Sequence, residues 1–329
     1  MFKLGPKALI MFFTGTVGVI IGAPIAVLIM SIFSPETVGG AGFDAVWRGL
    51  STIAGSWIGG GANQAAMLEV FKFNQEKYGA MVLVDIVVAN IWMAFLLFGI
   101  GRKEKIDKWL KADTSSIEEL KEKVTAYAAN VTRNPSLTDL MVILGVAFTA
   151  VGLSHWGSNS ISDVLKANFE IVNDPTSFAS TFGDRFFWMV TIATALGIAF
   201  SFTKLKEYEG AGASKIGSVF IYILVASIGM KMDLGSVMSN PGLLVVGLIW
   251  MAIHVLLLVI VAKIIKAPYF FLAVGSKANI GGAASAPIVA SAFHPSLASV
   301  GVLLAVFGYV IGTYGALLAA FLMEIAAPK

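Results

Sequence analysis

Residues 276–285 read SKANIGGAAS, a polar stretch with two adjacent glycines inside an otherwise apolar part of the chain. The sequences on either side, APYFFLAV and APIVASAF, carry no charged residue. A second stretch, GSWIGGGANQAAM at residues 55–67, shares with residues 275–285 an opening Gly-Ser, an Ile-Gly-Gly and an amide side chain. Two similar polar motifs in apolar surroundings predict that the chain is built from two related halves.

The composition is that of a membrane protein. The 329 residues are 57% hydrophobic and 13% charged, with a mean hydropathy of +0.83, whereas soluble domains carry about 25% charged residues. Long runs almost free of charge, at 8–43, 186–203 and 241–262, each supply the roughly 20 residues that a membrane-spanning helix needs. No ten-residue strand pattern is present, so we predict an all-α polytopic protein of the inner (plasma) membrane. The absence of cysteine excludes disulfides, thiolate metal sites and a Cys nucleophile.

Charge is concentrated in one segment, residues 101–134, which holds 14 of the 43 charged residues. Ser115 or Ser116 with Glu118 or Glu119 forms a capping-box pattern, which predicts a short soluble helix. Its eight Lys and Arg residues place the segment in the cytoplasm by the positive-inside rule. We therefore expect a first membrane repeat at 1–100, a cytoplasmic linker at 101–134 and a second membrane repeat at 135–329.

The order helix, broken element, helix recurs in each half, which predicts an internal repeat. In the first half, helices at 8–32 and 78–100 flank a broken element at 45–72. In the second half, helices at 136–156, 186–203, 213–232 and 241–265 precede a broken element at 267–293 and a last helix at 297–324. Because the second half has three more helices than the first, we expect the first repeat to be incomplete at its N-terminal side.

The charges also predict that the broken elements are re-entrant hairpins. Lys3 and Lys7 place the start of the first helix inside. If 45–72 crossed the membrane completely, the basic end of the helix at 78–100 would lie outside, against the positive-inside rule. A hairpin at 45–72 entered from outside removes the conflict, and the same reasoning makes 267–293 a hairpin entered from inside. The two repeats are therefore expected to be inverted.

The glycines suggest a binding site at these hairpins. Inside hydrocarbon, non-helical backbone survives only where it is buried in protein or lines a polar cavity, and helix breaks expose ends that carry partial charges. Paired broken elements are typical of transporter binding sites, although small residues also serve helix–helix packing. The expected substrate- or ion-binding residues of the two motifs are Ser56, Gly59, Gly60, Gly61, Asn63, Gln64, Ser276, Lys277, Asn279, Gly281, Gly282 and Ser285.

Ionisable residues at membrane depth are costly, so we expect them to be functional. Asp85 is a candidate site for Na⁺ or H⁺ or a partner for Lys277, and the structural alternative is a helix–helix hydrogen bond. Lys277 either neutralises an anionic group of a substrate or snorkels or pairs structurally. His254 is expected to be a hydrogen-bonded packing residue rather than a proton relay. Asn63 and Asn279 are expected to face one shared polar cavity.

Together with the two glycine motifs, the segments LGPKALIMFFTGTVGVIIG and VDIVVANIWMAFLL resemble the membrane family catalogued as domain of unknown function 819, over essentially the whole chain. That family is thought to be related to sodium–glutamate symporters and, more distantly, to citrate symporters and cation–proton antiporters. The resemblance implies two inverted repeats and cation-coupled transport of a small organic solute. Residues 55–64 and 275–285 match the hairpin motifs of the relatives. Family members usually begin with several helices before LGPKALIM, in agreement with an incomplete first repeat.

We therefore predict a secondary active transporter that couples Na⁺ or H⁺ to symport of a small organic anion or amino acid, held between the hairpins at the membrane midplane. An ion channel and an intramembrane enzyme are the alternatives. We expect no enzyme, because an aspartyl protease in the membrane needs two Asp residues and only Asp85 is clearly placed there. The expected partners are a small-molecule solute and the lipid bilayer, with no nucleic acid and no cofactor besides the coupling ion. A homodimer is left open.

Overall fold

The computed structural model describes residues 5–115, 117, 133–173, 179–213, 215–217, 219–220, 223, 226, 230, 240–294 and 297–328. Their regular secondary structure is helical, and five of these helices are long and apolar enough to cross a membrane. This confirms the predicted all-α polytopic membrane protein. The chain divides into two compact units, one formed by 1–68, 73–127 and 231–329 and the other by 69–72 and 128–230.

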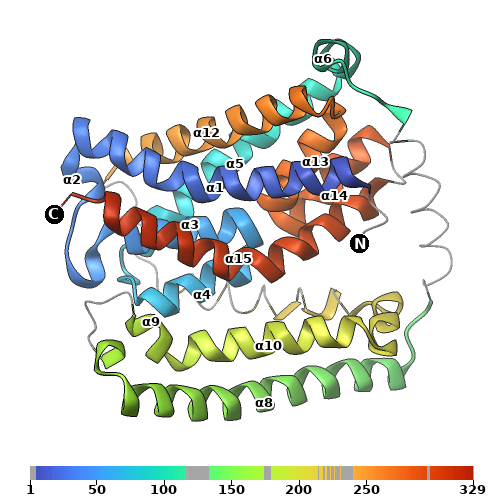
Figure 1. Ribbon diagram of the computed structural model, residues 1–329. Helices are drawn as coiled ribbons and strands as arrows, with labels where there is room; N and C mark the ends of the chain where they lie inside the picture. Colours follow the sequence, from blue (N-terminus) through green and yellow to red (C-terminus); the bar gives the residue numbers. More distant parts are fainter. Residues whose placement is uncertain are drawn as a thin grey trace. The chain divides into compact units, whose positions relative to one another are not determined.

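The first unit contains both glycine motifs. Its elements are α1 (Pro6–Phe33), α2 (Pro35–Val38), η2 (Gly42–Asp44), α3 (Val46–Gly59), α4 (Gly61–Phe71), α5 (Tyr78–Ile100), α6 (Lys103–Leu110), α12 (Gly242–Ile264), α13 (Tyr269–Asn279), α14 (Gly282–Phe293) and α15 (Ala298–Ala326) (Figure 1). The last residues of α4 are grouped with the second unit. The second unit also contains α8 (Leu137–Asn168), η3 (Glu170–Asn173), α9 (Ser180–Gly183), α10 (Arg185–Ser201) and η4 (Lys204–Ala211).

The predicted helices agree with α1, α5, α10, α12 and α15 to within about two residues at each end. One prediction, a helix over 136–156, was too short, because α8 continues to Asn168. Its buried face consists of serines at four-residue spacing, Ser154, Ser158 and Ser162, so helical periodicity persists where the apolar composition ends. The predicted helix at 213–232 and the capping partners Glu118 and Glu119 lie largely or wholly outside the described residues.

Both broken elements are hairpins, as predicted. At the base of the first, Asn74 donates its backbone N–H to Phe43 O (3.1 Å), and Lys77 Nζ donates to Asp44 (2.8 Å). These contacts return the chain to the start of α3, and Lys77 and Asn74 hold the pKa of Asp44 below its usual range. At the base of the second, the Phe293 ring at the end of α14 packs 5.3 Å from that of Phe270 at the start of α13. We call α3–α4 hairpin 1 and α13–α14 hairpin 2.

The two hairpins enter the first unit from opposite ends. At one end, Lys7 Nζ reaches Asp113 (3.2 Å) and Lys266 O (3.3 Å), which joins the start of α1, the charged linker and the entry to hairpin 2. At the other end, Ser31 Oγ donates to Ala326 O, and the backbone leads from α2 into hairpin 1. The halves α1–hairpin 1–α5 and α12–hairpin 2–α15 therefore run in opposite directions, in agreement with the topology predicted from charge.

The boundaries of the compact units do not coincide with those of the predicted repeats. Helices α8 and α10, expected within the second repeat, belong to the second unit, whereas hairpin 2 and all of hairpin 1 except the last residues of α4 belong to the first. Within the second unit, Ser162 Oγ donates to Gly183 O (2.6 Å), and Asp184 caps α10 by accepting from the N–H of Phe186 and Phe187. The repeat boundaries at 1–100 and 135–329 stay a prediction.

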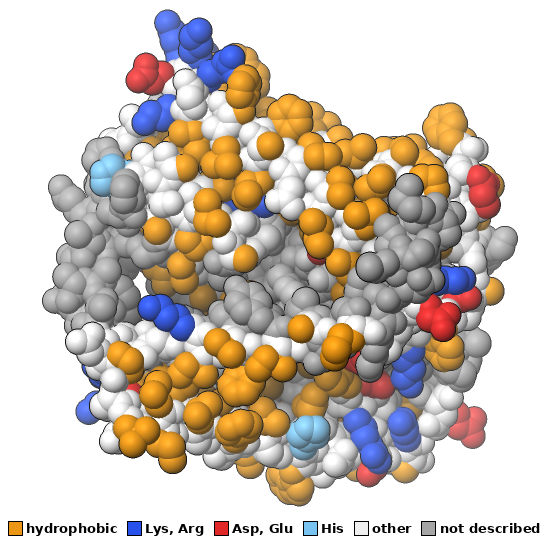
Figure 2. Space-filling view, turned by 180° about the vertical axis from the view of Figure 1, so that it is seen from behind, with side chains coloured by type: hydrophobic (Ala, Val, Ile, Leu, Met, Phe, Trp, Pro, Cys, Tyr) orange, Lys and Arg blue, Asp and Glu red, His pale blue; other side chains and the backbone are white. Residues whose placement is uncertain are grey.

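The surface of the helices is apolar, as expected for contact with lipid. Large hydrophobic side chains such as Phe33, Phe98 and Leu256 are exposed. Figure 2 shows hydrophobic side chains spread over the helices, with Lys and Arg gathered at α6 at the upper left. The basic residues of α6 follow directly after α5, so they mark the end of that span.

Helices α1 and α12 run side by side (Figure 1) and pack closely through glycines. A Cβ on Gly18 would lie 3.1 Å from the Cα of His254, and one on Gly22 would lie 2.7 Å from the Trp250 ring. Trp250 Nε1 also donates to Val19 O across this interface (2.8 Å). Glycine is thus required here because the helix backbones approach each other too closely for a side chain.

We predict that Gly18→Leu destabilises the first unit. The backbone of His254 cannot move aside as a flexible side chain could, and overpacking of this kind costs about 1–3 kcal/mol or more. The measurement is thermal unfolding in detergent. Gly145→Leu on α8 is the matched control, because a Cβ there meets nothing within 4 Å. Equal melting temperatures for the two variants would contradict the packing described here.

Candidate functional site

Asp85 on α5 accepts three hydrogen bonds from hairpin 1. Ser56 Oγ (2.6 Å) and Gln64 Nε2 (3.1 Å) donate to one carboxylate oxygen, and Trp57 Nε1 (2.8 Å) donates to the other. Because Ser56 and Trp57 lie on α3 and Gln64 lies on α4, one carboxylate holds both arms of the hairpin against α5. This is the helix–helix hydrogen bond that the sequence left as the structural alternative.

The same geometry bears on Asp85 as a Na⁺ ligand. A carboxylate has about four acceptor positions, and three are occupied by protein donors whose positive ends would face a bound cation. Among the described residues no group of three or more His, Cys, Asp or Glu is placed to hold a metal ion. The donors around Asp85 therefore favour its role as an anchor of hairpin 1 over direct coordination of Na⁺.

Lys277 lies near the end of α13 and is only 2% exposed. Its ammonium has a single long contact, 3.5 Å to Ala89 O on α5. Asp85 lies close enough to attract it electrostatically, but the ion pairs among the described residues do not include these two. Of the roles left open for Lys277, a direct ion pair with Asp85 is therefore the one that the structure does not show. Burying an ammonium with so few acceptors is costly, which marks Lys277 as the least satisfied charge of the unit.

His254 is hydrogen-bonded on both ring nitrogens. Nδ1 lies 3.0 Å from Gly15 O, which can only accept, so we assign the proton to Nδ1. Nε2 then accepts from Ser276 Oγ (2.8 Å), which in turn accepts from Trp92 Nε1 (2.8 Å). This chain links four helices with every member satisfied. The geometry agrees with the packing role expected for His254, and it gives Ser276 the same role.

The amides of Asn63 and Asn279 are engaged within the protein. Asn279 accepts from Thr16 Oγ1 (2.7 Å) and donates to Phe12 O (2.9 Å) and Gly275 O (3.0 Å). Asn63 accepts from Thr313 Oγ1 (2.7 Å) and donates to Gly59 O, 2.7 Å away. These bonds attach each hairpin to a long helix, Asn279 to α1 and Asn63 to α15, while a polar cavity shared by the two amides stays a prediction.

The tips of the two hairpins meet. Gly60 (φ 78°) ends α3, and Gly281 (φ 102°) precedes α14; both conformations are favourable only for glycine. A Cβ on Gly282 would lie 4.0 Å from Gly60 Cα and 3.9 Å from the Tyr309 ring of α15. Helices α4 and α14 both begin at this junction, so two N-terminal helix ends, each with partial positive charge, converge inside the first unit.

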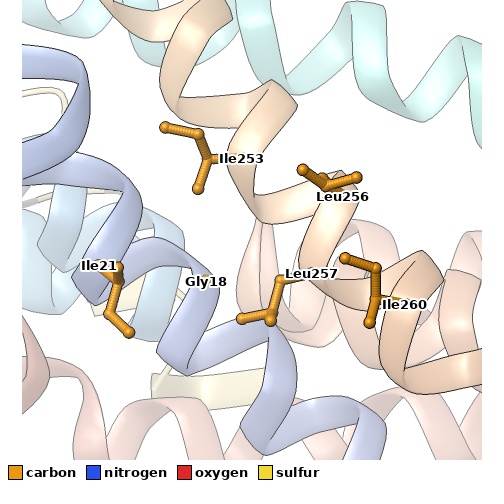
Figure 3. Close-up of a pocket in the computed structure, with 6 residues that line it drawn as sticks. All are labelled: Gly18, Ile21, Ile253, Leu256, Leu257 and Ile260. Carbon is orange, nitrogen blue, oxygen red and sulfur yellow. The ribbon is translucent and has the colours of Figure 1, made fainter. Parts of the chain in front are cut away.

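An open groove between α1 and α12 was also found (Figure 3). It is lined by Gly18, Ile21, Ile253, Leu256, Leu257 and Ile260. Leu256 is 60% exposed, and the lining offers no polar side chain that could orient a solute. This groove suits hydrocarbon, whereas the polar groups converge at the hairpin tips.

Similarity to known proteins identifies the family of the chain. The profile of the family described as "Protein of unknown function (DUF819)" matches residues 1–325. The chain belongs to the DUF819 family. It is 27% identical over 324 residues to the "Uncharacterized membrane protein YjcL" of Bacillus subtilis (strain 168), covering 95% of this chain and 75% of the relative. No solved structure matches the chain. The protein is thus a multi-pass membrane protein of this family.

Several residues that form hydrogen bonds in the site are not among those predicted from the sequence. Thr16 and Thr313 lie in long apolar helices, where a single threonine is unremarkable, yet each bonds a hairpin amide. Trp57 and Trp92 are not among the predicted site residues, but both donate hydrogen bonds in the interior. Tyr309 borders both tips. Only a buried Trp in a polar motif, as in GSWIGG, offered a signal.

We predict that Asp85→Leu destabilises the protein far more than Asp85→Asn. Leucine leaves three donors without an acceptor, at about 1–3 kcal/mol for each buried group, whereas an amide oxygen can still accept from Trp57. Unfolding in detergent measures the difference. Asn90→Leu on the same helix is the control, because Asn90 is exposed and bonds only within α5. Equal losses for Asp85→Asn and Asp85→Leu would show that charge, rather than hydrogen bonding, makes Asp85 necessary.

We also predict energetic coupling between Thr16 and Asn279. In a double-mutant cycle of Thr16→Val and Asn279→Ala, the coupling energy is expected to be about 0.6–1.7 kcal/mol, as for hydrogen bonds between membrane helices. The cycle is measured by unfolding in detergent. Pairing Thr16→Val with Ser291→Ala, at the far end of hairpin 2, should be additive. Additivity in both cycles would contradict the link between α1 and hairpin 2.

Proposed function

We propose that this protein is a secondary active transporter of a small organic anion or amino acid, which binds where the two hairpins meet. The observation that carries the proposal is the junction of Gly60 and Gly282, where hairpins from opposite ends come together beside α15. Broken helical elements that meet inside a membrane unit are typical of transporters, because their free ends supply binding groups without water.

The charges at the junction support an anionic group on the solute. The N-terminal ends of α4 and α14 carry partial positive charge, and the buried ammonium of Lys277 adds a full one. Asp85 on α5 already accepts hydrogen bonds from three donors of the protein. The excess of unsatisfied positive groups favours a solute that brings negative charge.

Coupling to Na⁺ or H⁺ is part of the proposal, as is a location in the inner (plasma) membrane. The distant relationship to sodium–glutamate symporters that the family resemblance implies supports cation coupling, and the two opposed hairpins are the kind of architecture that alternating access uses. The solute is the substrate, and no resident cofactor is proposed. The described spans of the first unit hold two acidic residues, Asp85 on α5 and Glu324 near the end of α15. Asp85 accepts hydrogen bonds from three donors of hairpin 1 and Glu324 lies near Arg48, so neither supports the paired acids of an intramembrane aspartyl protease.

We predict that the purified protein in proteoliposomes catalyses counterflow of a labelled carboxylate or amino acid, driven by a Na⁺ or H⁺ gradient. Lys277→Gln should reduce this transport at least tenfold, because it removes the buried charge at the tips. Lys105→Gln, an exposed change on α6, is the matched control and should transport normally. Conductance far above the turnover of a carrier would instead identify a channel, and absence of counterflow across the whole solute library would refute the proposal.

A further inference from the structure

A small cradle of unsatisfied donors surrounds Gly281 at the tip of hairpin 2. If Gly281 carried a Cβ, this atom would lie 3.2 Å from Lys277 Nζ and would collide with Ser285 Oγ. Both donors therefore border the same space beside the Cα of Gly281, and a side chain at residue 281 would collide with Ser285. Gly281 also adopts φ 102°, so the backbone itself requires glycine here.

The donors of the cradle lack acceptors among the residues that the structure describes. Within these residues the buried hydroxyl of Ser285 has no hydrogen-bond partner. Lys277, with three N–H donors, has only its 3.5 Å contact to Ala89 O. No side chain caps the first turn of α14, a helix of 12 residues, whose leading backbone N–H groups therefore also point toward this space. Three kinds of donor converge without an acceptor.

We propose that this cradle binds one carboxylate group of the solute, with Lys277 and Ser285 as its side-chain ligands and the N-terminal end of α14 as its backbone ligand. The inference rests on the proposed transport function and names the chemistry that the site recognises. A carboxylate supplies two oxygens on one planar group, so one oxygen reaches the ammonium and the other reaches the hydroxyl and the helix end. It satisfies groups that are otherwise buried at a cost.

The local charge favours a monovalent carboxylate over phosphate. The cradle has one full positive charge, and the carboxylate of Asp85 lies near enough to offset part of it. His254, the other titratable group near Lys277, is neutral in the tautomer that its two hydrogen bonds require. A phosphate dianion is usually held by arginine or by several cations, which the described residues around Gly281 do not supply. One ammonium, one hydroxyl and one helix end match one carboxylate.

The test is binding to the purified full chain in detergent, without any transport step. The probes are acetate, lactate and succinate, with acetamide, chloride and phosphate as comparisons, and the readouts are calorimetry and thermal stabilisation. The carboxylates are expected to bind and acetamide is not. Lys277→Gln should weaken carboxylate binding at least tenfold, and Ser285→Ala about threefold or more. Ser291→Ala, elsewhere on α14, is the control and should bind as the wild type does.

The outcomes separate this inference from the transport proposal. Binding of acetate that Lys277→Gln and Ser285→Ala leave unchanged would overturn the cradle, even if counterflow is intact. Equal binding of chloride or phosphate, or no binding of any carboxylate, would overturn the carboxylate assignment. Carboxylate binding that the two variants weaken, without counterflow, would support the cradle and refute transport. Lys277→Gln removes a buried charge, so the melting temperature of the ligand-free variant is also measured. A melting temperature equal to that of the wild type shows that the loss of binding is not a loss of fold.

Discussion

The rest of the structure depends on how the broken backbone at the hairpin tips is kept away from lipid. Interrupting a helix inside hydrocarbon frees polar backbone groups that lipid cannot satisfy. In the first unit, α15 packs so closely against both tips that a side chain on α15 at the point of contact has no room. A Cβ on Gly308 would lie 2.5 Å from Ile58 O and 3.4 Å from Ala278 O, one carbonyl from each hairpin. One glycine of α15 therefore lies between the two hairpin ends.

Each hairpin is attached to a long helix of the opposite half. Hairpin 1 belongs to the first half, but its Asn63 bonds Thr313 on α15 of the second half. Hairpin 2 belongs to the second half, but its Asn279 bonds Thr16 on α1 of the first half. The halves are therefore interlocked rather than merely adjacent, and neither hairpin can leave its place without losing buried hydrogen bonds. Such an arrangement favours movement of the first unit as one body over opening of a single hairpin.

The sequence predicted the architecture better than it predicted the partners of the site residues. Glycine pairs and the distribution of Lys and Arg sufficed to place both hairpins and their directions, because these follow from local backbone freedom and from the membrane. Partners such as Thr16 for Asn279 are 263 residues apart in the chain, and nothing in an apolar run singles out one threonine. For the same reason the sequence left several partners open for Asp85, whereas the structure engages it with hairpin 1.

The two charged side chains of the site, Asp85 and Lys277, differ in how many hydrogen-bond partners the protein gives them. Asp85 is met by a hydroxyl, an indole and an amide from one hairpin, so its acceptor positions are largely filled before any ligand arrives. Lys277 is 2% exposed, and the hydrogen bond found for it among the described residues is one long contact to a carbonyl. In a low-dielectric interior an unbalanced charge attracts its counter-ion more strongly than it would in water. A protein that satisfies the hydrogen bonds of Asp85 and leaves those of Lys277 unsatisfied is prepared to bind an anion, and the donors beside Gly281 are where we propose that this anion binds.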